Sequence, residues 1–249
     1  MPKIIVEICC GSADDVIQAK LGGAERVELN SSMFMGGLTA TVGTLTIAKR
    51  TGLSIMAMVR PREGGFCYTD AEFETMLLDT AELIKAGADG IVFGILNQDG
   101  TVDTSRCKEM LSVIGDKQSV FHRALDVVPD WRAALDELIN LKITRVLTSG
   151  QEQSALLGAE TIRQMVEYAA DRIEICVGGG VRLNTVNDII EKTGADQVHA
   201  YLTRSMSDNS TTGNPAIHFG GALYPPEDMY KMADARSVEE LISKVKHAW

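Results

Sequence analysis

Short apolar runs alternate with amphipathic segments along the chain. Eight of these runs are rich in Val, Ile or Leu, namely Ile4–Ile8, Arg26–Leu29, Ser54–Val59, Gly90–Phe93, Ser119–His122, Arg145–Thr148, Ile173–Val177 and Gln197–His199. Such runs are typical of strands covered on both faces of a parallel sheet. Helical patterns lie between them, at Asp14–Leu21, from Thr69 to Ala86, and at Asp103–Ile114, Asp130–Leu141, Ser154–Ala169 and Asn184–Lys192.

Local signals mark where several helices begin and end. Ser12 with Asp15, and Thr69 with Glu72, have the spacing of a capping box. Glycines stand where four helices should stop, at Gly22, Gly52, Gly87 and Gly194. Strict alternation over eight units predicts an α/β fold, a closed (β/α)₈ or TIM barrel that forms one domain over residues 1–249.

The C-terminal part departs from this pattern. The segment Ser205–Pro226, rich in Ser, Asn, Thr, Gly and Pro, predicts a long loop after the eighth strand that is either functional or mobile. Ser237 with Glu240 predicts the start of a last helix that extends to about Trp249.

Composition limits the partners and the compartment. A chain of 249 residues has the usual size of one such barrel. A net charge of −10 argues against nucleic acid and anionic membrane surfaces as partners. No run approaches the roughly 18 apolar residues of a membrane span, and the N-terminal run is too short for a signal peptide. The five cysteines are odd in number and lack a disulfide-scaffold spacing, so we expect free thiols and a cytoplasmic location.

Polar side chains at the strand ends predict a site, because barrel enzymes work at the C-terminal mouth. If Glu7 and Glu28 face inward, so do Cys9 and Asn30, whereas Cys10 faces the helices. We assign candidate catalytic roles to Glu7, Glu28, His122, Asp126 and His199. Candidate anion-binding residues are Arg60, Arg62, Arg123, Ser149, Gly178, Gly179 and Gly180. A plain salt-bridged layer is the alternative interpretation.

Several motifs resemble the CutC copper homeostasis family. They are Glu7-Ile-Cys9, Arg26-Val-Glu-Leu, Gly36-Gly-Leu-Thr39, Arg60-Pro-Arg62, Phe66-Cys-Tyr-Thr-Asp70, Phe121-His-Arg-Ala-Leu-Asp126 and Arg145-Val-Leu-Thr-Ser-Gly150, in family order from residue 6 to about residue 200. The resemblance implies a cytoplasmic barrel, a homodimer and a role in copper handling. It also implies Cu(I) ligands at cysteines ending the first and second strands. Cys9 fits the first position, but Asn30 occupies the second, and Ala40 replaces a common proline.

Three hypotheses about function remain open. Cu(I) prefers thiolate and thioether ligands, which Cys9, Met56 and Met58 would supply. An enzyme acting on a small anionic substrate would use the arginines and the glycine loop, with His122 as general acid or base oriented by Asp126 or Glu28. A protein that binds a metabolite without chemistry is the third. No catalytic signature identifies a reaction.

Overall fold

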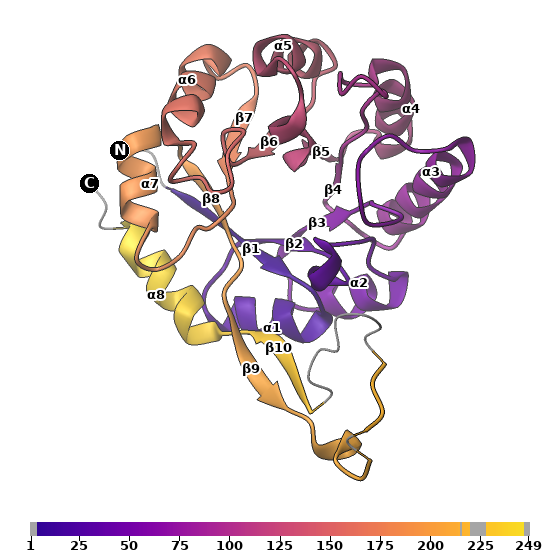
Figure 1. Ribbon diagram of the computed structural model, residues 1–249, viewed down its shortest axis with the longest axis vertical. Coiled ribbons are helices and arrows are strands. Elements are labelled where there is room, and N and C mark those ends of the chain that lie inside the picture. Colours follow the sequence, from indigo (N-terminus) through magenta and orange to yellow (C-terminus); the bar gives the residue numbers. More distant parts are fainter. Residues whose placement is uncertain (1–3, 215, 220–227, 247–249) are drawn as a thin grey trace.

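The computed structural model describes residues 4–214, 216–219 and 228–246. Eight parallel strands form a closed barrel in the order β1 to β8, with helices outside it (Figure 1). The strands are β1 Ile5–Cys10, β2 Arg26–Leu29, β3 Ser54–Met58, β4 Gly90–Phe93, β5 Gln118–Phe121, β6 Arg145–Thr148, β7 Glu174–Val177 and β8 Gln197–Ala200. The predicted (β/α)₈ barrel is therefore confirmed.

The barrel closes where β1 pairs with β8. In the register of this pair Glu7 lies opposite His199, and on the other side of β1 Cys9 lies opposite Glu28 of β2. Parallel pairing of this kind brings the C-terminal ends of first, second and last strands to one edge. Residues far apart in the sequence thus meet at the mouth of the barrel.

The helices cover the outer face of the barrel. They are α1 Ala13–Leu21, α2 Val42–Lys49, α3 Asp70–Lys85, α4 Thr104–Ile114, α5 Trp131–Asn140, α6 Ala159–Ala169, α7 Val186–Thr193 and α8 Ala235–Lys246, with short 3₁₀ turns η1 Met33–Met35, η2 Arg123–Val127 and η3 Asn209–Thr211. The main apolar core lies between strands and helices and includes Cys10, Val27 and Leu29. A smaller apolar cluster of Met56, Met58, Val92 and Val120 fills part of the interior. None of the helices described is both long and apolar enough to cross a bilayer.

Capping residues explain most helix boundaries. At α3 the Thr69 hydroxyl accepts from the Glu72 amide, and the Glu72 carboxylate accepts from the Thr69 amide at 2.8 Å, which confirms that capping box. Ser12 caps α1, but the Asp15 carboxylate accepts from the Gly11 amide instead of the Ser12 amide. Its other oxygen accepts from the Ala233 amide at 2.6 Å, so this acid joins the α1 entry to the C-terminal part of the chain.

Two of the helix starts that differ from the sequence prediction have a clear structural reason. The predicted helix from Ser154 begins only at Ala159, because residues 154–158 form turns whose Ala155 amide donates to the Gly179 carbonyl. The last helix begins at Ala235, two residues before Ser237, because Asp234 accepts hydrogen bonds from the amide and the hydroxyl of Ser237. Its predicted end at Trp249 lies outside the described residues.

The segment predicted as a loop begins as a strand. Strand β9 Thr203–Ser207 pairs antiparallel with β10 Met229–Ala233, and this ribbon projects from the barrel (Figure 1). Its side chains are mostly exposed, so the sequence lacks the apolar run by which a buried strand is found. Residues 215 and 220–226 of the predicted loop lie outside the described residues.

Candidate functional site

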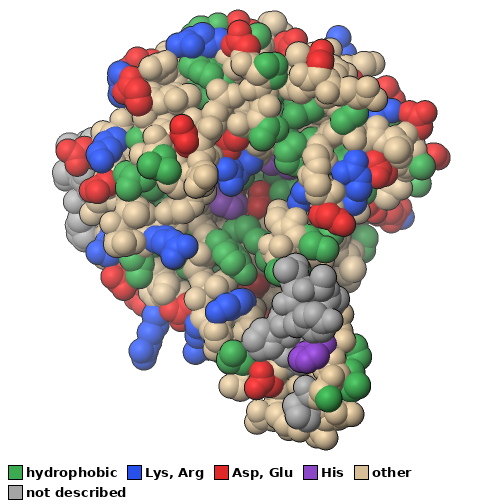
Figure 2. Space-filling model, viewed as in Figure 1, with side chains coloured by type: hydrophobic (Ala, Val, Ile, Leu, Met, Phe, Trp, Pro, Cys, Tyr) green, Lys and Arg blue, Asp and Glu red, His purple; other side chains and the backbone are tan. Residues whose placement is uncertain are grey.

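A pocket of about 460 Å³ opens at the C-terminal ends of the strands. One wall comes from β1, β2 and β8, and the opposite wall comes from the segments that follow β5 and β7. Lys or Arg and His side chains gather around the hollow in the face drawn in Figure 2. The pocket-lining residues that were predicted as site residues are Cys9, Glu28, Arg60, His122, Arg123, Gly179, Gly180 and His199. The structure therefore brings most of the candidates together.

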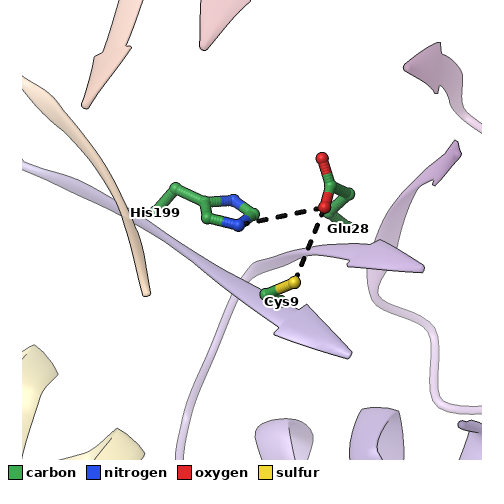
Figure 3. A group of neighbouring side chains, drawn as sticks. All are labelled: Cys9, Glu28 and His199. Atoms are coloured by element: carbon green, nitrogen blue, oxygen red, sulfur yellow. Dashed lines mark hydrogen bonds and ion pairs between the residues drawn. The ribbon is translucent and has the colours of Figure 1, made fainter. Parts of the chain in front are cut away.

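Cys9, Glu28 and His199 form one compact buried cluster (Figure 3). The Cys9 thiol donates to Glu28 Oε2 at 3.6 Å, and His199 Nε2 lies 3.8 Å from the same oxygen. One ligand atom from each of the three residues lies within 4.8 Å of the other two. Asn30 completes the cluster, since its Nδ2 donates to Glu28 Oε2 at 2.8 Å and to Cys9 Sγ at 3.6 Å.

Glu7 lies below this cluster and holds His199 in place. His199 Nδ1 is 2.9 Å from Glu7 Oε1, and Arg26 Nε donates to Glu7 Oε2 at 2.6 Å. Burial alone would raise the pKa of Glu7, but the hydrogen bond from His199 and the charge of Arg26 lower it to about 2. Burial would lower the pKa of His199, but Glu28, Cys9 and Glu7 together raise it well above its usual value. The imidazole is therefore a cation held between carboxylates.

The same contacts continue across the floor of the barrel. Arg26 donates to Gln197, Gln197 donates to Glu174, and Arg145 links Glu174 to Gln118. These residues were not among the site residues predicted from the sequence. The spacing in the sequence could have identified two of them. Arg26 and Gln197 stand two positions before Glu28 and His199 in their strands, and therefore share their inward face. Because each buried ion in this network meets an opposite charge, it can be buried without leaving an uncompensated ion.

The two histidines differ in protonation. Burial and the nearby positive charge of Arg60 lower the pKa of His122 to about 3, so this imidazole is neutral. Its Nδ1 accepts from the Ala124 amide at 3.1 Å. The hypothesis that Asp126 or Glu28 orients His122 is therefore wrong, since a backbone amide does so. The proton must reside on Nε2, which is buried and has no partner among the described residues.

Arg60 is held by backbone carbonyls. Its Nη1 donates to the carbonyls of Met35 and Gly37, and its Nη2 donates to Gly64. Gly37 adopts a φ of +86°, and a Cβ there would lie 2.5 Å from Asn30 Oδ1. The Gly36-Gly-Leu-Thr39 motif thus lets the chain pack directly against two pocket residues.

Three other candidates lie beside the pocket. Arg62 pairs with Glu72, with Nε 2.5 Å from Oε1, and this pair is tied to the start of α3. Asp126 accepts from the Ser149 amide and hydroxyl, and from Arg123 Nε at 2.7 Å. Asp126 and Ser149 therefore fix the guanidinium of Arg123, which does line the pocket.

The glycine turn after β7 forms part of the opposite wall. Gly179 and Gly180 adopt φ values of +93° and +77°, a region that glycine occupies without strain. Gly178 packs below them, where a Cβ would lie 2.8 Å from Leu147 Cδ1. Arg182 follows the turn and lines the pocket.

Comparisons with known proteins agree on one family. The family model described as "CutC family" matches residues 4–203. The "family protein CutC" of Treponema denticola is 49% identical over 98% of this chain and 100% of its own length. The "copper homeostasis protein cutC homolog" of Homo sapiens is 35% identical over 98% of this chain and 89% of its own length. A crystal structure of CutC from Streptococcus agalactiae superposes with a TM-score of 0.76 at 33% identity, covering 79% of this chain and 97% of that chain.

More distant structures share only the barrel. Thiamine phosphate pyrophosphorylase from Pyrococcus furiosus superposes with a TM-score of 0.59 at 11% identity, over 99% of this chain and 98% of that chain. This likeness concerns the fold alone.

Proposed function

The chain belongs to the CutC family, and from this membership and the Cys9, Glu28 and His199 cluster we propose that it binds copper as Cu(I). The observation that carries the proposal is the convergence of a thiol, an imidazole and a carboxylate from three different strands within 4.8 Å. A soft cation such as Cu(I) selects the sulfur and nitrogen atoms of this set.

Asn30 changes the ligand set from that implied by the family. It supplies an amide donor 3.6 Å from Cys9 Sγ where a second thiolate would stand. His199 is therefore the second strong ligand in our proposal, and the Met58 thioether lines the same pocket. Burial raises the pKa of Cys9 to about 12, so the thiol is protonated until the ion binds. Cu(I) binding through Cys9 Sγ and His199 Nε2 releases two protons, because a protonated ring nitrogen has no free lone pair for the ion. Glu28 Oε2 already accepts the S–H and lies 3.8 Å from Nε2, so it is positioned to receive one of these protons, and the other leaves to solvent.

Anaerobic titration with Cu(I) in the presence of a competing chelator tests this proposal. We expect one Cu(I) per chain in the wild type, with loss of this binding in Cys9→Ser. Cys10→Ser is the matched control, because Cys10 is the next residue on β1 but faces the helix layer. Wild-type uptake by Cys9→Ser would rule out the site, and we expect His199→Asn to weaken binding in the same assay.

The opposite wall supports a second candidate function, the binding of a small anion in the same pocket. Arg123 and Arg182 line it together with Gly179 and Gly180. Guanidinium groups and backbone amides are common anion donors in barrels of this type. If the bound anion is also a substrate, the protonated His199, held by Glu7, is the candidate acid. Inorganic phosphate, titrated calorimetrically into metal-free protein, tests for the anion site.

We also propose a cytoplasmic location and a homodimer. The cysteines are all free thiols, which suits a reducing compartment. The ribbon and the nearby η1 turn expose large apolar side chains, with Phe34 63%, Tyr230 51% and Met229 49% accessible. A second copy of the chain would cover such side chains. Sedimentation velocity should show a dimer at micromolar concentration, and a monomer throughout would contradict it.

A further inference from the structure

We infer that the pocket takes a small ligand with two chemically different ends, an anionic group at the Arg123 and Arg182 wall and hydroxyl or amino groups at the Glu28 wall. This inference rests on the second candidate function, anion binding, and adds the chemistry of the other end. It is carried by the polar groups that each wall leaves without a protein partner.

The anionic end is defined by donors that remain available. Arg123 is fixed by Asp126 and by Ser149, whose hydroxyl accepts from Nη2 at 2.6 Å. Its Nη1 lies over the glycine turn, 3.7 Å from where a Cβ of Gly179 would be. Within the described residues, the amides of 179–181 donate to no protein acceptor, and the Arg182 guanidinium meets no carboxylate. A fixed guanidinium such as that of Arg123 and unpaired backbone amides bind a phosphate or carboxylate.

The other end presents acceptors and one neutral donor. Glu28 Oε2 is used by Asn30 and Cys9, but Glu28 Oε1 is buried and has no partner among the described residues. His122 also lines the pocket, and its Nε2–H is likewise unpaired. Buried polar atoms are normally paired, so these two atoms point to a ligand that pairs them. Hydroxyl groups suit both atoms, since a hydroxyl donates to a carboxylate oxygen such as Glu28 Oε1 and accepts from an N–H such as that of His122.

The topology places these two ends on facing walls. In the closed order β1 to β8, β2 lies opposite β6, and Glu28 is the penultimate residue of β2 whereas Arg123 and Arg182 follow β5 and β7. A cavity of about 460 Å³ lies between them, within the range of small-molecule sites. The Glu28 carboxylate would repel an anion, so the charges also set the orientation of the ligand. A bare inorganic anion would leave the Glu28 end unpaired.

Two probes that differ only in hydroxyl groups test the inference. Glycerol phosphate and n-propyl phosphate carry the same anion, but only the first has hydroxyls for the Glu28 end. In calorimetric titrations of metal-free protein, we expect glycerol phosphate to bind at least about tenfold more tightly. This comparison needs no variant and therefore does not depend on the folding of one.

Variants then assign each end. Arg182→Gln should lower the affinities for both probes by a similar factor, because it removes a donor from the anionic end alone. The ratio of the two affinities should therefore stay the same. Glu28→Gln should reduce the ratio of the affinity for glycerol phosphate to that for n-propyl phosphate, while n-propyl phosphate binds as before. Arg204→Gln, an exposed arginine on β9, is the matched control and should change neither affinity.

The outcomes distinguish the two-ended ligand from anion binding, the function on which it rests. Equal affinity for the two phosphates would overturn the two-ended ligand and leave the anion site standing. Absence of binding by both probes and by inorganic phosphate would overturn the anion site and the inference together. Binding that Arg182→Gln leaves unchanged would place the anion elsewhere and overturn the assignment of this wall.

Discussion

Glu7→Gln should cause a large loss of stability. Glu7 is 2% exposed and is paired on one side with Arg26 and on the other with His199. Its pKa falls from 4.5 to about 2 on folding, because the hydrogen bond from His199 and the charge of Arg26 outweigh burial. A carboxylate whose pKa is lower in the folded state stabilises the fold above pH 4.5 and loses this contribution as the pH falls toward 2.

The magnitude follows from that difference. From 4.5 to about 2 the pKa changes by about 2.5 units, and at about 1.4 kcal/mol per unit this gives about 3 kcal/mol at neutral pH. Removing one partner from a buried ion pair costs about 3–5 kcal/mol, which agrees. We therefore expect Glu7→Gln to lower the free energy of unfolding by at least about 3 kcal/mol at pH 7.

Urea unfolding at pH 7 and pH 3 measures both parts of this prediction. From pH 7 to pH 3, the free energy of unfolding of the wild type should fall by about 2 kcal/mol as Glu7 becomes protonated. The variant lacks this carboxylate and should not show this part of the fall. Glu160→Gln is the control, because Glu160 also pairs with an arginine but its side chain is 65% exposed, and we expect little change. If Glu7→Gln unfolds with wild-type free energy, or shows the same difference between the two pH values, the buried pair does not act as described.

Three further predictions concern single residues. Gly37→Ala should lower the free energy of unfolding by about 1–2 kcal/mol or more in thermal melts, because φ is +86° and the new Cβ would meet Asn30, whereas Gly43→Ala in α2 should not destabilise. The His122 imidazole should show no protonation by NMR from pH 8 down to pH 5, since its pKa is about 3, and a midpoint near 6.5 would contradict its burial beside Arg60. Native protein should present one fast-reacting thiol to a disulfide reagent, because Cys67 is exposed and the other cysteines are buried, so Cys67→Ser should abolish the fast phase.

The site was only partly accessible from the sequence. Strand periodicity predicts that Cys9 faces inward if Glu7 does, and Asn30 if Glu28 does, and Cys9, Glu28 and Asn30 all line the pocket. Periodicity does not reveal which inward group pairs with which, so Arg62 was expected at the pocket but pairs with Glu72. Arg182, two residues beyond the predicted Gly178–Gly180 turn, lines the pocket but was not among the candidate residues.

The sequence by itself determined the barrel, because eight apolar strands separated by amphipathic helices can bury both faces of a parallel sheet only with helices on the outside. It also indicated that Glu7 shares a face of its strand with Cys9, and Glu28 with Asn30, because side chains alternate between the two faces of a strand. The tertiary structure alone decided that His199 is charged and His122 neutral, since protonation depends on neighbours that come from distant strands. It likewise decided the β9–β10 ribbon, whose backbone pairing leaves no apolar pattern in the side chains.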